Sequence, residues 1–450
     1  MPTMAESTFL PVPAEEELRR RFAKIKPPMT ASEAVVEASR CLFCFDAPCV
    51  QACPASIDIP MFIRQIMSRN ITGAAKTILT QNILGKSCAY VCPTEMLCEG
   101  SCVYQKLNKQ PIDIGRLQGV AVDHAIDHHL RFFEKGLSTG KRVAVIGGGP
   151  AGLACAHELT RLGHTAVVFE GSEKVGGLNR YGVAPYKYSN PEADKEAAYI
   201  NEIGFEIRTG RRVTSAEMGD LEKNFDAIFL GVGLGGSQYP KIPGENKKNV
   251  FGAAEFIYHL RDKEQKISVG RRVVIVGAGN TAIDAAVGSA KLGAHVTLVY
   301  RRSEKDQSAY DFEVDLAKQH GVVFQYLTSP VSILGADQVE GVECVRNRVE
   351  PSKNGEKSSI APVAGSNFVL SCDMVVFATG QEKRAEFFSA IPGLELERGK
   401  VKVNKDFQTA NQKYFAGGDC VNGGKEVVHA ATQGRDAARG INSFLQRRNL

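Results

Sequence analysis

The order strand, glycine-rich turn, helix, strand occurs twice in this chain, and it limits the possible folds more than any other feature. In the first copy RVAVI (142–146) precedes the glycines and TAVVFE (165–170) follows the helix. In the second copy RVVIV (272–276) and HVTLVY (295–300) take the same places, about 130 residues further along. Short β-branched runs that alternate with helices are typical of parallel sheets. The repeat is too long for a solenoid and predicts two homologous dinucleotide-binding domains.

The first glycine turn has the pattern G-x-G-x-x-G. Gly147 permits a tight turn, Gly149 lets the backbone approach a pyrophosphate, and Gly152 allows the helix to pack closely on the strand. The phosphates would lie at the helix N-terminus, where free amides and the helix dipole favour negative charge. Glu170 ends the next strand and can accept hydrogen bonds from the ribose hydroxyls of an adenosine. The candidate cofactor-binding residues here are Gly147, Gly148, Gly149, Pro150, Ala151, Gly152 and Glu170.

Two further glycine motifs favour FAD as the dinucleotide of this first domain. Gly176-Gly177-Leu178 follows Glu170 closely, as in flavoproteins that bind two dinucleotides. Gly417-Gly418-Asp419 follows the strand KYFA near the end of the sequence. In the flavoproteins that this sequence resembles, that Asp binds the ribityl or pyrophosphate region, and the next helix points at the isoalloxazine. The further candidate cofactor-binding residues are Gly177, Leu178, Lys187, Gly418 and Asp419.

The second glycine turn, GAGNTA (277–282), is the G-x-G-x-x-A variant that is common in nicotinamide sites. The next strand ends without an acid, and Arg301 and Arg302 follow it. Guanidinium groups can bind a 2′-phosphate bidentately, so the pair favours NADPH, although a solvated arginine pair is the alternative. Ser308 stands where we expect a further arginine, which leaves NADH open. The candidate nucleotide-binding residues are Gly277, Ala278, Gly279, Asn280, Thr281, Arg301, Arg302, Ala378, Thr379 and Gly380.

Eight of the twelve cysteines lie within residues 41–102. The first group reads CLFCFDAPCVQACP (41–54) and the second CAYVCPTEMLCEGSC (88–102). In a reducing compartment, thiolates at this density more often bind metal than form disulfides. Zinc modules usually have two C-x2–4-C pairs with a longer gap, whereas a compact run that ends in Cys-Pro resembles ferredoxins. The spacing favours iron–sulfur clusters, with structural zinc as the alternative.

The cysteine-rich region is predicted to be helical. Residues 30–33, Thr-Ala-Ser-Glu, fit a capping box that starts a helix running to the first cysteines. SIDIPMFIRQIMSRN (56–70) and ITGAAKTILTQN (71–82) have apolar residues at helical spacing, and no convincing strand precedes residue 140. The predicted fold is therefore α/β, with two Rossmann-like dinucleotide-binding domains preceded by an α-helical iron–sulfur domain. The predicted domains are 1–135 for the clusters, 140–245 with 376–450 for FAD, and 246–375 for NAD(P)H.

Composition and charge argue against several classes of function. The chain has 55 Lys and Arg residues against 50 Asp and Glu, and this net charge of +5 is spread without a long basic run. Nucleic-acid binding therefore has no compositional support. No apolar stretch approaches the ~18–20 residues that span a bilayer, and residues 1–22 lack the apolar segment of a secretory signal. We expect a cytoplasmic protein with no nucleic-acid or membrane partner.

The predicted cofactors together indicate a change in the number of electrons carried. Nicotinamide gives up two electrons as a hydride, iron–sulfur clusters carry one each, and a flavin can do both. We expect no catalytic side chain, because the cofactors carry the chemistry. A binding or regulatory module with degenerate sites and zinc is the alternative from a different class, and it would be colourless.

The chain from residue 30 onward resembles one family of enzymes. The segments that carry the resemblance are CLFCFDAPCVQACPASIDIPMFI, GKSCAYVCPTEMLCEGSC and PIDIGRLQ, then GGGPAGL, VGGL, GAGNTAID, YRR, ATG and FAGGDC. They are similar to the iron–sulfur flavoprotein part of dihydropyrimidine dehydrogenases, including the small subunit of the bacterial NAD(P)-dependent enzymes, and to the small subunit of glutamate synthases.

The resemblance implies two [4Fe–4S] clusters with four protein ligands each. Cys41, Cys44, Cys49 and Cys102 would hold one cluster, and Cys53, Cys92, Cys98 and Gln118 the other. Cys88 would then be a non-ligand. The spacing alone leaves Cys88 open as the fourth ligand in place of Gln118.

The resemblance also implies a partner. The long dehydrogenases of this family continue into an FMN barrel where the pyrimidine is reduced, whereas this sequence ends at Leu450. We therefore expect a hetero-oligomer with an FMN/iron–sulfur catalytic subunit, in which NAD(P)H supplies electrons for the reduction of uracil or thymine. The alternatives are a glutamate synthase small subunit and a subunit of the ferredoxin–NADP reductase type.

Overall fold

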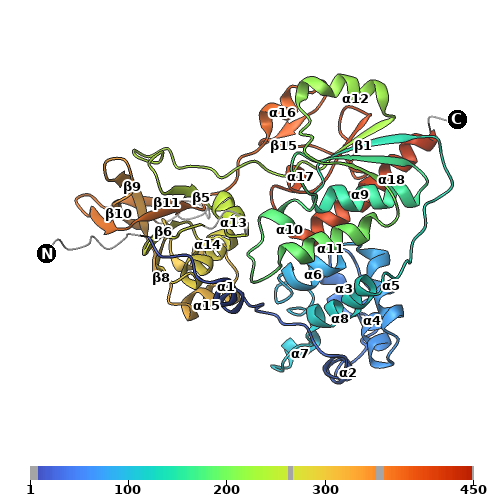
Figure 1. The fold of residues 1–450 in the computed structure, drawn as a ribbon, viewed down its shortest axis with the longest axis horizontal. Coiled ribbons are helices and arrows are strands. Elements are labelled where there is room, and N and C mark those ends of the chain that lie inside the picture. The colour runs from blue at the N-terminus through green and yellow to red at the C-terminus, as the bar shows by residue number, and fades with distance from the viewer. Residues whose placement is uncertain (1–8, 262–266, 351–358, 448–450) are drawn as a thin grey trace. The chain divides into compact units, whose positions relative to one another are not determined.

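The computed structural model describes residues 9–261, 267–350 and 359–447 of the chain (Figure 1). The chain forms two compact units. The larger unit contains Lys24–Val183, Lys187–Leu234 and residues 383–447, and the smaller unit contains residues 9–23, Ala184–Tyr186 and the described part of Gly235–Glu382. Each unit carries one of the two glycine turns, and the larger unit also carries the eight clustered cysteines.

Short helices form the cysteine-rich part of the larger unit, as predicted. They are α2 (Ala31–Ser39), α3 (Pro48–Ala52), α4 (Ile59–Met67), α5 (Ile71–Gln81), α6 (Gly85–Val91), α7 (Val103–Lys106) and α8 (Ile114–Asp127). The predicted capping box is confirmed, because Thr30 Oγ1 accepts from the amide of Glu33 and the Glu33 carboxylate accepts from the amide of Thr30. Asp58 and Asn70 cap α4 and α5 with one bond each, their Oδ1 atoms accepting from the amides of Met61 and Gly73. The apolar faces of these helices share one buried core.

A parallel five-stranded sheet forms the rest of the larger unit, in the order β16-β4-β1-β2-β3. Its strands are β1 (Arg142–Ile146), β2 (Thr165–Phe169), β3 (Glu206–Arg208), β4 (Ala227–Leu230) and β16 (Tyr414–Ala416). Val143 and Val145 share a core with α9 (Pro150–Arg161) and α18 (Val427–Arg447). Ala144 and Ile146 share the other core with α12 (Met218–Asn224). Also in this unit are α10 (Leu178–Tyr181), α11 (Asn190–Asn201), a 3₁₀ turn (Ser215–Glu217), α16 (Ala385–Ser389), β14 (Leu396–Glu397), β15 (Lys400–Val401) and α17 (Asp419–Asn422).

The smaller unit repeats this parallel sheet, in the order β5-β13-β6-β7-β8. Its strands are β5 (Val250–Gly252), β6 (Arg272–Val276), β7 (His295–Val299), β8 (Val323–Gln325) and β13 (Met374–Phe377), and its helices are α1 (Glu15–Arg21), α13 (Ala253–Arg261), α14 (Asn280–Lys291), α15 (Asp311–Gln319) and a 3₁₀ turn (Glu304–Asp306). A second, antiparallel sheet contains β9 (Thr328–Leu334), β10 (Gly341–Glu350), β11 (Ser359–Pro362) and β12 (Phe368–Ser371). The two matching parallel sheets are those expected of two dinucleotide-binding domains.

Residues 9–23 pack in the smaller unit, although the predicted iron–sulfur domain began at residue 1. The amide of Leu10 donates to Val269 O, and Arg21 and Lys291 each donate a side-chain hydrogen bond to the other's carbonyl. The segment Ala184–Tyr186 joins them there, because the Tyr186 hydroxyl is buried and donates to Asp284 on α14. These contacts link residues far apart in the sequence, which is why local patterns did not predict them.

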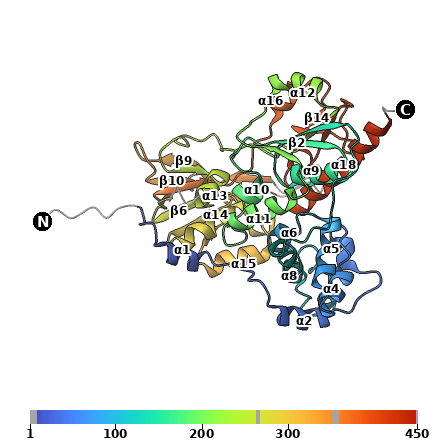
Figure 2. The same ribbon diagram turned by 45° about the vertical axis from the view of Figure 1, so that its right-hand side comes forward.

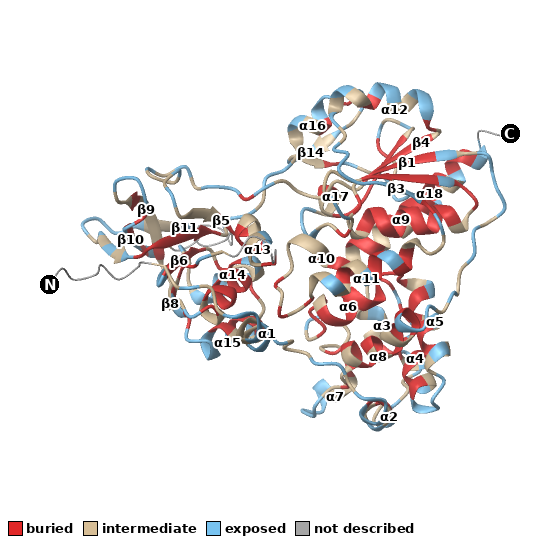
Figure 3. Cartoon of the chain, viewed as in Figure 1, coloured by how far each residue is buried: buried red, intermediate tan, exposed pale blue. Residues whose placement is uncertain are grey.

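In the larger unit, helices of the cysteine-rich part pack directly on those that cover the sheet. Figures 1 and 2 both show α9 and α18 side by side, and α6 also packs against α18 and α11. Arg435 on α18 donates to Gln81 O at the end of α5. Buried residues line the facing sides of these helices (Figure 3). Among the described helices, none has the length and hydropathy to cross a bilayer.

A buried carboxyl group lies where α6 packs against α11. Glu196 on α11 is 2% exposed, and it accepts hydrogen bonds from the amide of Ser87 (2.8 Å) and from the hydroxyl of Tyr188 (3.1 Å). Burial raises the pKa of Glu196 to about 7, although these two bonds and the charge of Lys86 oppose the shift. The folded chain therefore holds this proton more tightly than the unfolded chain does.

Glu196→Gln should remove the pH dependence that this carboxyl gives to stability. Because the folded pKa lies above the ordinary value, its contribution is fully present below about pH 4.5 and is lost as the pH rises through about 7. As the pH rises from 5 to 8, the free energy of unfolding of the variant should therefore increase by on the order of 2–3 kcal/mol relative to that of the wild type. The melting temperatures of both proteins across this range test it, with the exposed Glu206→Gln as the control. A constant difference in melting temperature would contradict the assignment.

Candidate functional site

The first predicted glycine turn lies between β1 and the N-terminus of α9. The amide of Gly147 donates to Phe169 O, and the φ of Gly147 is +101°, a left-handed value that favours glycine. A Cβ on Gly152 would overlap Gly147 O, so this position needs glycine for helix–strand packing. A Cβ on Gly149 would lie 3.6 Å from its nearest neighbour, the Cα of Gly177. The turn is therefore closed by backbone at Gly152 and open at Gly149.

Glu170 closes one side of this turn. One carboxylate oxygen accepts from the amide of Gly148 (2.8 Å) and the other from the amide of Ser172 (2.7 Å). Two arginines that the motif did not predict lie in the same neighbourhood. Burial and then the nearby Arg212 lower the pKa of the half-buried Arg384, and the charge of Glu170 opposes this shift.

The other two FAD motifs lie against the same turn. The amide of Gly176 donates to Gly148 O (2.8 Å) in the segment before α10. A Cβ on Gly418 would lie 3.0 Å from the Cβ of Ala151, so the third motif also borders the start of α9. Asp419 begins α17, and burial raises its pKa. The structure thus brings the residues of all three motifs together at the carboxyl ends of β1 and β16.

The same place offers polar atoms that fit a bound flavin nucleotide. Gln433 on α18 accepts from the amide of Gly418 (2.8 Å), a contact that the sequence did not predict. Nearby on α18, His429 Nδ1 and Thr432 Oγ1 are buried, and no hydrogen-bond partner is found for either in the described part of the chain. Buried polar groups are normally hydrogen-bonded, so these atoms suit a polar ligand at the start of α18.

The second glycine turn lies between β6 and α14. The amide of Gly277 donates to Val299 O, and a Cβ on this glycine would overlap Ala378 O, so the residues after β13 close the turn from one side. On the other side Ala278 O accepts from the amides of Ser308 and Ala309. The structure therefore brings the predicted segments 277–281 and 378–380 together.

Arg301 and Arg302 follow β7 at the carboxyl edge of the same sheet, with Arg301 exposed and Arg302 half-buried. Ser308 Oγ lies 3.3 Å from the place of a Cβ on Gly279, so the residue that stands in place of a further arginine lies at the glycine turn itself. Asn280 Oδ1 accepts from the amide of Tyr310, so this predicted contact residue also fixes the loop above the turn. Lys187 lies apart from these residues in the sequence, on the connection between α10 and α11.

Four cysteines of the predicted first cluster line one pocket. Its lining includes Cys41, Cys44, Cys49 and Cys102, together with apolar residues of α3, α4 and α8. Burial, followed by the nearby Cys41 and Cys102, raises the pKa of Cys49 to about 12. Thiols that raise one another's pKa in this way suit a positively charged metal group, which stabilises thiolates.

The second group brings together Cys53, Cys88, Cys92 and Cys98. The hydrogen bond with Cys88 and then burial raise the pKa of Cys92, to which Cys98 and Cys53 also contribute. Cys88 is buried and accepts from Asn82 Nδ2 at 3.0 Å, a contact that the sequence did not predict. In the described ranges no three His, Cys, Asp or Glu side chains converge as the ligands of one metal ion do. The residue types and their proximity fit an iron–sulfur cluster.

Gln118 is buried on α8 near the second group. Its Nε2 donates to Gly85 O at 2.7 Å, one turn before Cys88 on α6. Gln118 and Cys88 therefore both remain candidates for the fourth ligand.

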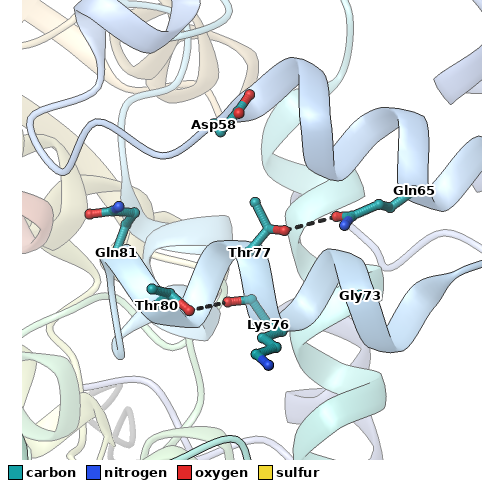
Figure 4. A pocket seen from close by; sticks show the side chains of 7 residues that line it. All are labelled: Asp58, Gln65, Gly73, Lys76, Thr77, Thr80 and Gln81. Atoms are coloured by element: carbon teal, nitrogen blue, oxygen red, sulfur yellow. Dashed lines mark hydrogen bonds between the residues drawn. The ribbon is translucent and has the colours of Figure 1, made fainter.

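A separate groove lies between α4 and α5 (Figure 4). The residues that line it are Asp58, Gln65, Gly73, Lys76, Thr77, Thr80 and Gln81. Thr77 donates to Gln65 Oε1 across it (2.9 Å), as the figure shows. None of the predicted site residues lines this groove.

Two family profiles match consecutive parts of the chain. The profile of the family described as pyridine nucleotide-disulphide oxidoreductase matches residues 141–434. The profile described as dihydropyrimidine dehydrogenase domain II, 4Fe-4S cluster, matches residues 18–130. These matches confirm the predicted α/β fold class with an N-terminal iron–sulfur domain, and the predicted cofactors FAD, NAD(P)H and 4Fe–4S.

Two curated relatives match almost the whole chain. The glutamate synthase [NADPH] small chain of Escherichia coli K12 is 34% identical over an alignment of 448 positions, which covers 94% of this chain and 94% of that protein. The NAD-dependent dihydropyrimidine dehydrogenase subunit PreT of the same organism is 34% identical over 425 residues, 94% of this chain and 97% of that protein. Among solved structures, FprA of Mycobacterium tuberculosis in complex with NADPH has a TM-score of 0.58 at 18% identity, over 69% of this chain and 85% of that one. The similarity to FprA shows a shared fold only.

Proposed function

Because this chain belongs to the pyridine nucleotide-disulphide oxidoreductases that carry an N-terminal 4Fe–4S domain, like PreT and the glutamate synthase small chain, we propose that it is the electron-input subunit of a larger enzyme. It is an NAD(P)H-dependent oxidoreductase. A bound FAD would supply the conversion of a two-electron hydride from the nicotinamide into single electrons for the iron–sulfur clusters.

One observation carries this proposal: the FAD turn and the eight clustered cysteines lie in a single compact unit. The hydrogen bond from Arg435 to Gln81 O joins the helix at the flavin site to the helices around the cysteines. A fixed separation between two redox groups suits electron transfer, because positioning is what the protein supplies to its cofactors.

The residues that hold each group are part of the proposal. Gly147–Gly152, Glu170, Gly177, Leu178, Gly418 and Asp419 hold FAD, and Gly277–Thr281 with Ala378–Gly380 hold the nicotinamide dinucleotide. Arg301 and Arg302 contact a 2′-phosphate, so the chain prefers NADPH. Two [4Fe–4S] clusters are held by the two cysteine groups already described, the second completed by Gln118, and Lys187 contributes to cofactor binding.

The partner that we propose is an FMN/iron–sulfur catalytic subunit that reduces uracil or thymine. The relatives named PreT support this partner. A second candidate is the large subunit of a glutamate synthase, which the equal identity to the glutamate synthase small chain supports as well. The two differ in what the partner must reduce, a pyrimidine or the product of 2-oxoglutarate and glutamine.

Two experiments test these proposals in turn. The anaerobically purified chain should be brown-yellow, lose its flavin absorbance when NAD(P)H is added, and reduce a one-electron dye. A preparation with FAD and iron that cannot reduce the dye would contradict the electron-input function. The chain purified with its genomic neighbour should then oxidise NAD(P)H with uracil; oxidation only with 2-oxoglutarate plus glutamine would replace the dehydrogenase by the synthase.

A further inference from the structure

We propose that Asn347 is a positioning residue for the segment Arg301–Arg302, and that the antiparallel sheet of the smaller unit thereby sets the preference for the phosphorylated nucleotide. The inference rests on the proposed contact of these arginines with a 2′-phosphate. It adds a role for a residue that lies 45 positions further along the chain than Arg302, outside every nucleotide motif.

The segment after β7 is held by its backbone carbonyls. Tyr300 O accepts from the amide of Thr328, and Arg302 O accepts from the amide of Leu327, both at 2.9 Å. Thr328 is the first residue of β9 in the antiparallel sheet, and Leu327 directly precedes it. The arginine segment is therefore fastened to that sheet on both sides of Arg301.

Asn347 supplies the bond between these two. It lies on β10, is 7% exposed, and its Nδ2 donates to Arg301 O and to Ser329 Oγ, both at 2.8 Å. Its backbone amide donates to Leu327 O at 2.7 Å. Leu327 has a φ of +50°, a left-handed value that a leucine rarely adopts without such support. The buried side chain of Asn347 thus ties Arg301 to Ser329 on β9, and its backbone amide supports the neighbouring turn at Leu327.

These bonds fix the backbone and leave recognition to the guanidinium groups. Bidentate binding of a phosphate needs a planar group at a defined place, so a displaced backbone costs more than a displaced flexible side chain. Loss of the Asn347 donor leaves Arg301 O without this hydrogen bond, which the segment can replace by moving toward water. Such a movement weakens contact with a 2′-phosphate, which NADH lacks.

The test compares two substitutions that remove the donor in the FAD-loaded chain. Asn347→Leu has a similar size without a donor, and Asn347→Asp keeps the shape but places an oxygen where the nitrogen donates. Both should raise the KM for NADPH about fivefold to tenfold and change the KM for NADH less than twofold, with kcat retained. Calorimetric binding of 2′,5′-ADP should weaken by the same factor, whereas binding of 5′-AMP should not change.

Three comparisons make the result decisive. Asn367→Ala removes an exposed asparagine that directly precedes β12 and donates to Glu343 on β10, and it should change the KM for neither nucleotide. Arg301→Ala with Arg302→Ala should raise the KM for NADPH, and Asn347→Leu added to it should add little. If the Asn347 variants raise the KM for NADPH and for NADH equally, the positioning role of Asn347 is wrong. The same holds if they leave the KM for NADPH unchanged while the arginine variant raises it. Either result leaves the proposed 2′-phosphate contact of the arginines standing. If the arginine variant shows no preference change, the proposed 2′-phosphate contact is wrong, and this inference is wrong with it.

Discussion

Replacement of Cys92 by Ser should lower the iron content of the anaerobically purified chain from about eight atoms to about four. Cys92 is buried between Cys53, Cys88 and Cys98, so a hydroxyl at this place removes a soft ligand from the second group only. The first group, with its own pocket, should keep its cluster. FAD should stay bound, and NAD(P)H should still bleach it, while transfer of electrons to a partner should fall more than a hundredfold.

Iron analysis and low-temperature EPR of the reduced protein measure this outcome. Cys344→Ser is a matched control, because Cys344 is also buried but lies in the core of the smaller unit. It should keep all the iron. An unchanged iron content in Cys92→Ser would remove this cysteine from the ligand set.

The same measurement decides how the second cluster is completed. Gln118→Leu should lower the iron content if the resemblance to the family holds for this ligand, and Cys88→Ala should leave it unchanged. The structure gives each candidate a polar neighbour: Asn82 donates to Cys88 Sγ, and Gln118 donates to Gly85 O. Iron loss on replacement of Cys88 and not of Gln118 would reverse the assignment.

Local rules explain which parts of the fold could be predicted. The glycine turns, the strands before them and the capping box at Thr30 each depend on a few neighbouring residues, and the structure has each of them where the pattern placed it. The cysteine groups also follow from spacing, because short helices bring residues a few positions apart together.

The remaining parts depend on contacts between distant segments. No local pattern marks Asn347 as the donor to Arg301, or Gln433 as the acceptor for Gly418, because each is an ordinary polar residue inside a strand or a helix. The antiparallel sheet β9–β12 and the packing of residues 9–23 in the smaller unit were missed for the same reason. Only the structure shows that Asn347 is buried in a strand, where its polar atoms need hydrogen-bond partners.

Replacement of Gly149 by Ala should weaken FAD binding about a hundredfold or more and leave the folded apoprotein intact. The φ of Gly149 is −77° and its ψ −174°, so alanine fits this backbone without strain. No protein atom lies within 3.4 Å of the added Cβ, whose nearest neighbour is the Cα of Gly177 at 3.6 Å. The methyl group therefore occupies space that only a ligand would need, and a pyrophosphate that approaches the amides of α9 would meet it.

Two further glycines separate this effect from a general loss of stability. Gly152→Ala puts a Cβ onto Gly147 O, a backbone atom that cannot move away, so this variant should lose several kcal/mol of stability as well as FAD. Gly219→Ala, in α12 with open space around it, should keep FAD and gain up to about 1 kcal/mol. Flavin content, FAD titration of the apoproteins and their melting temperatures distinguish the three. If Gly149→Ala binds FAD as the wild type does, the pyrophosphate does not lie over this turn, because a pyrophosphate there would meet the added methyl group.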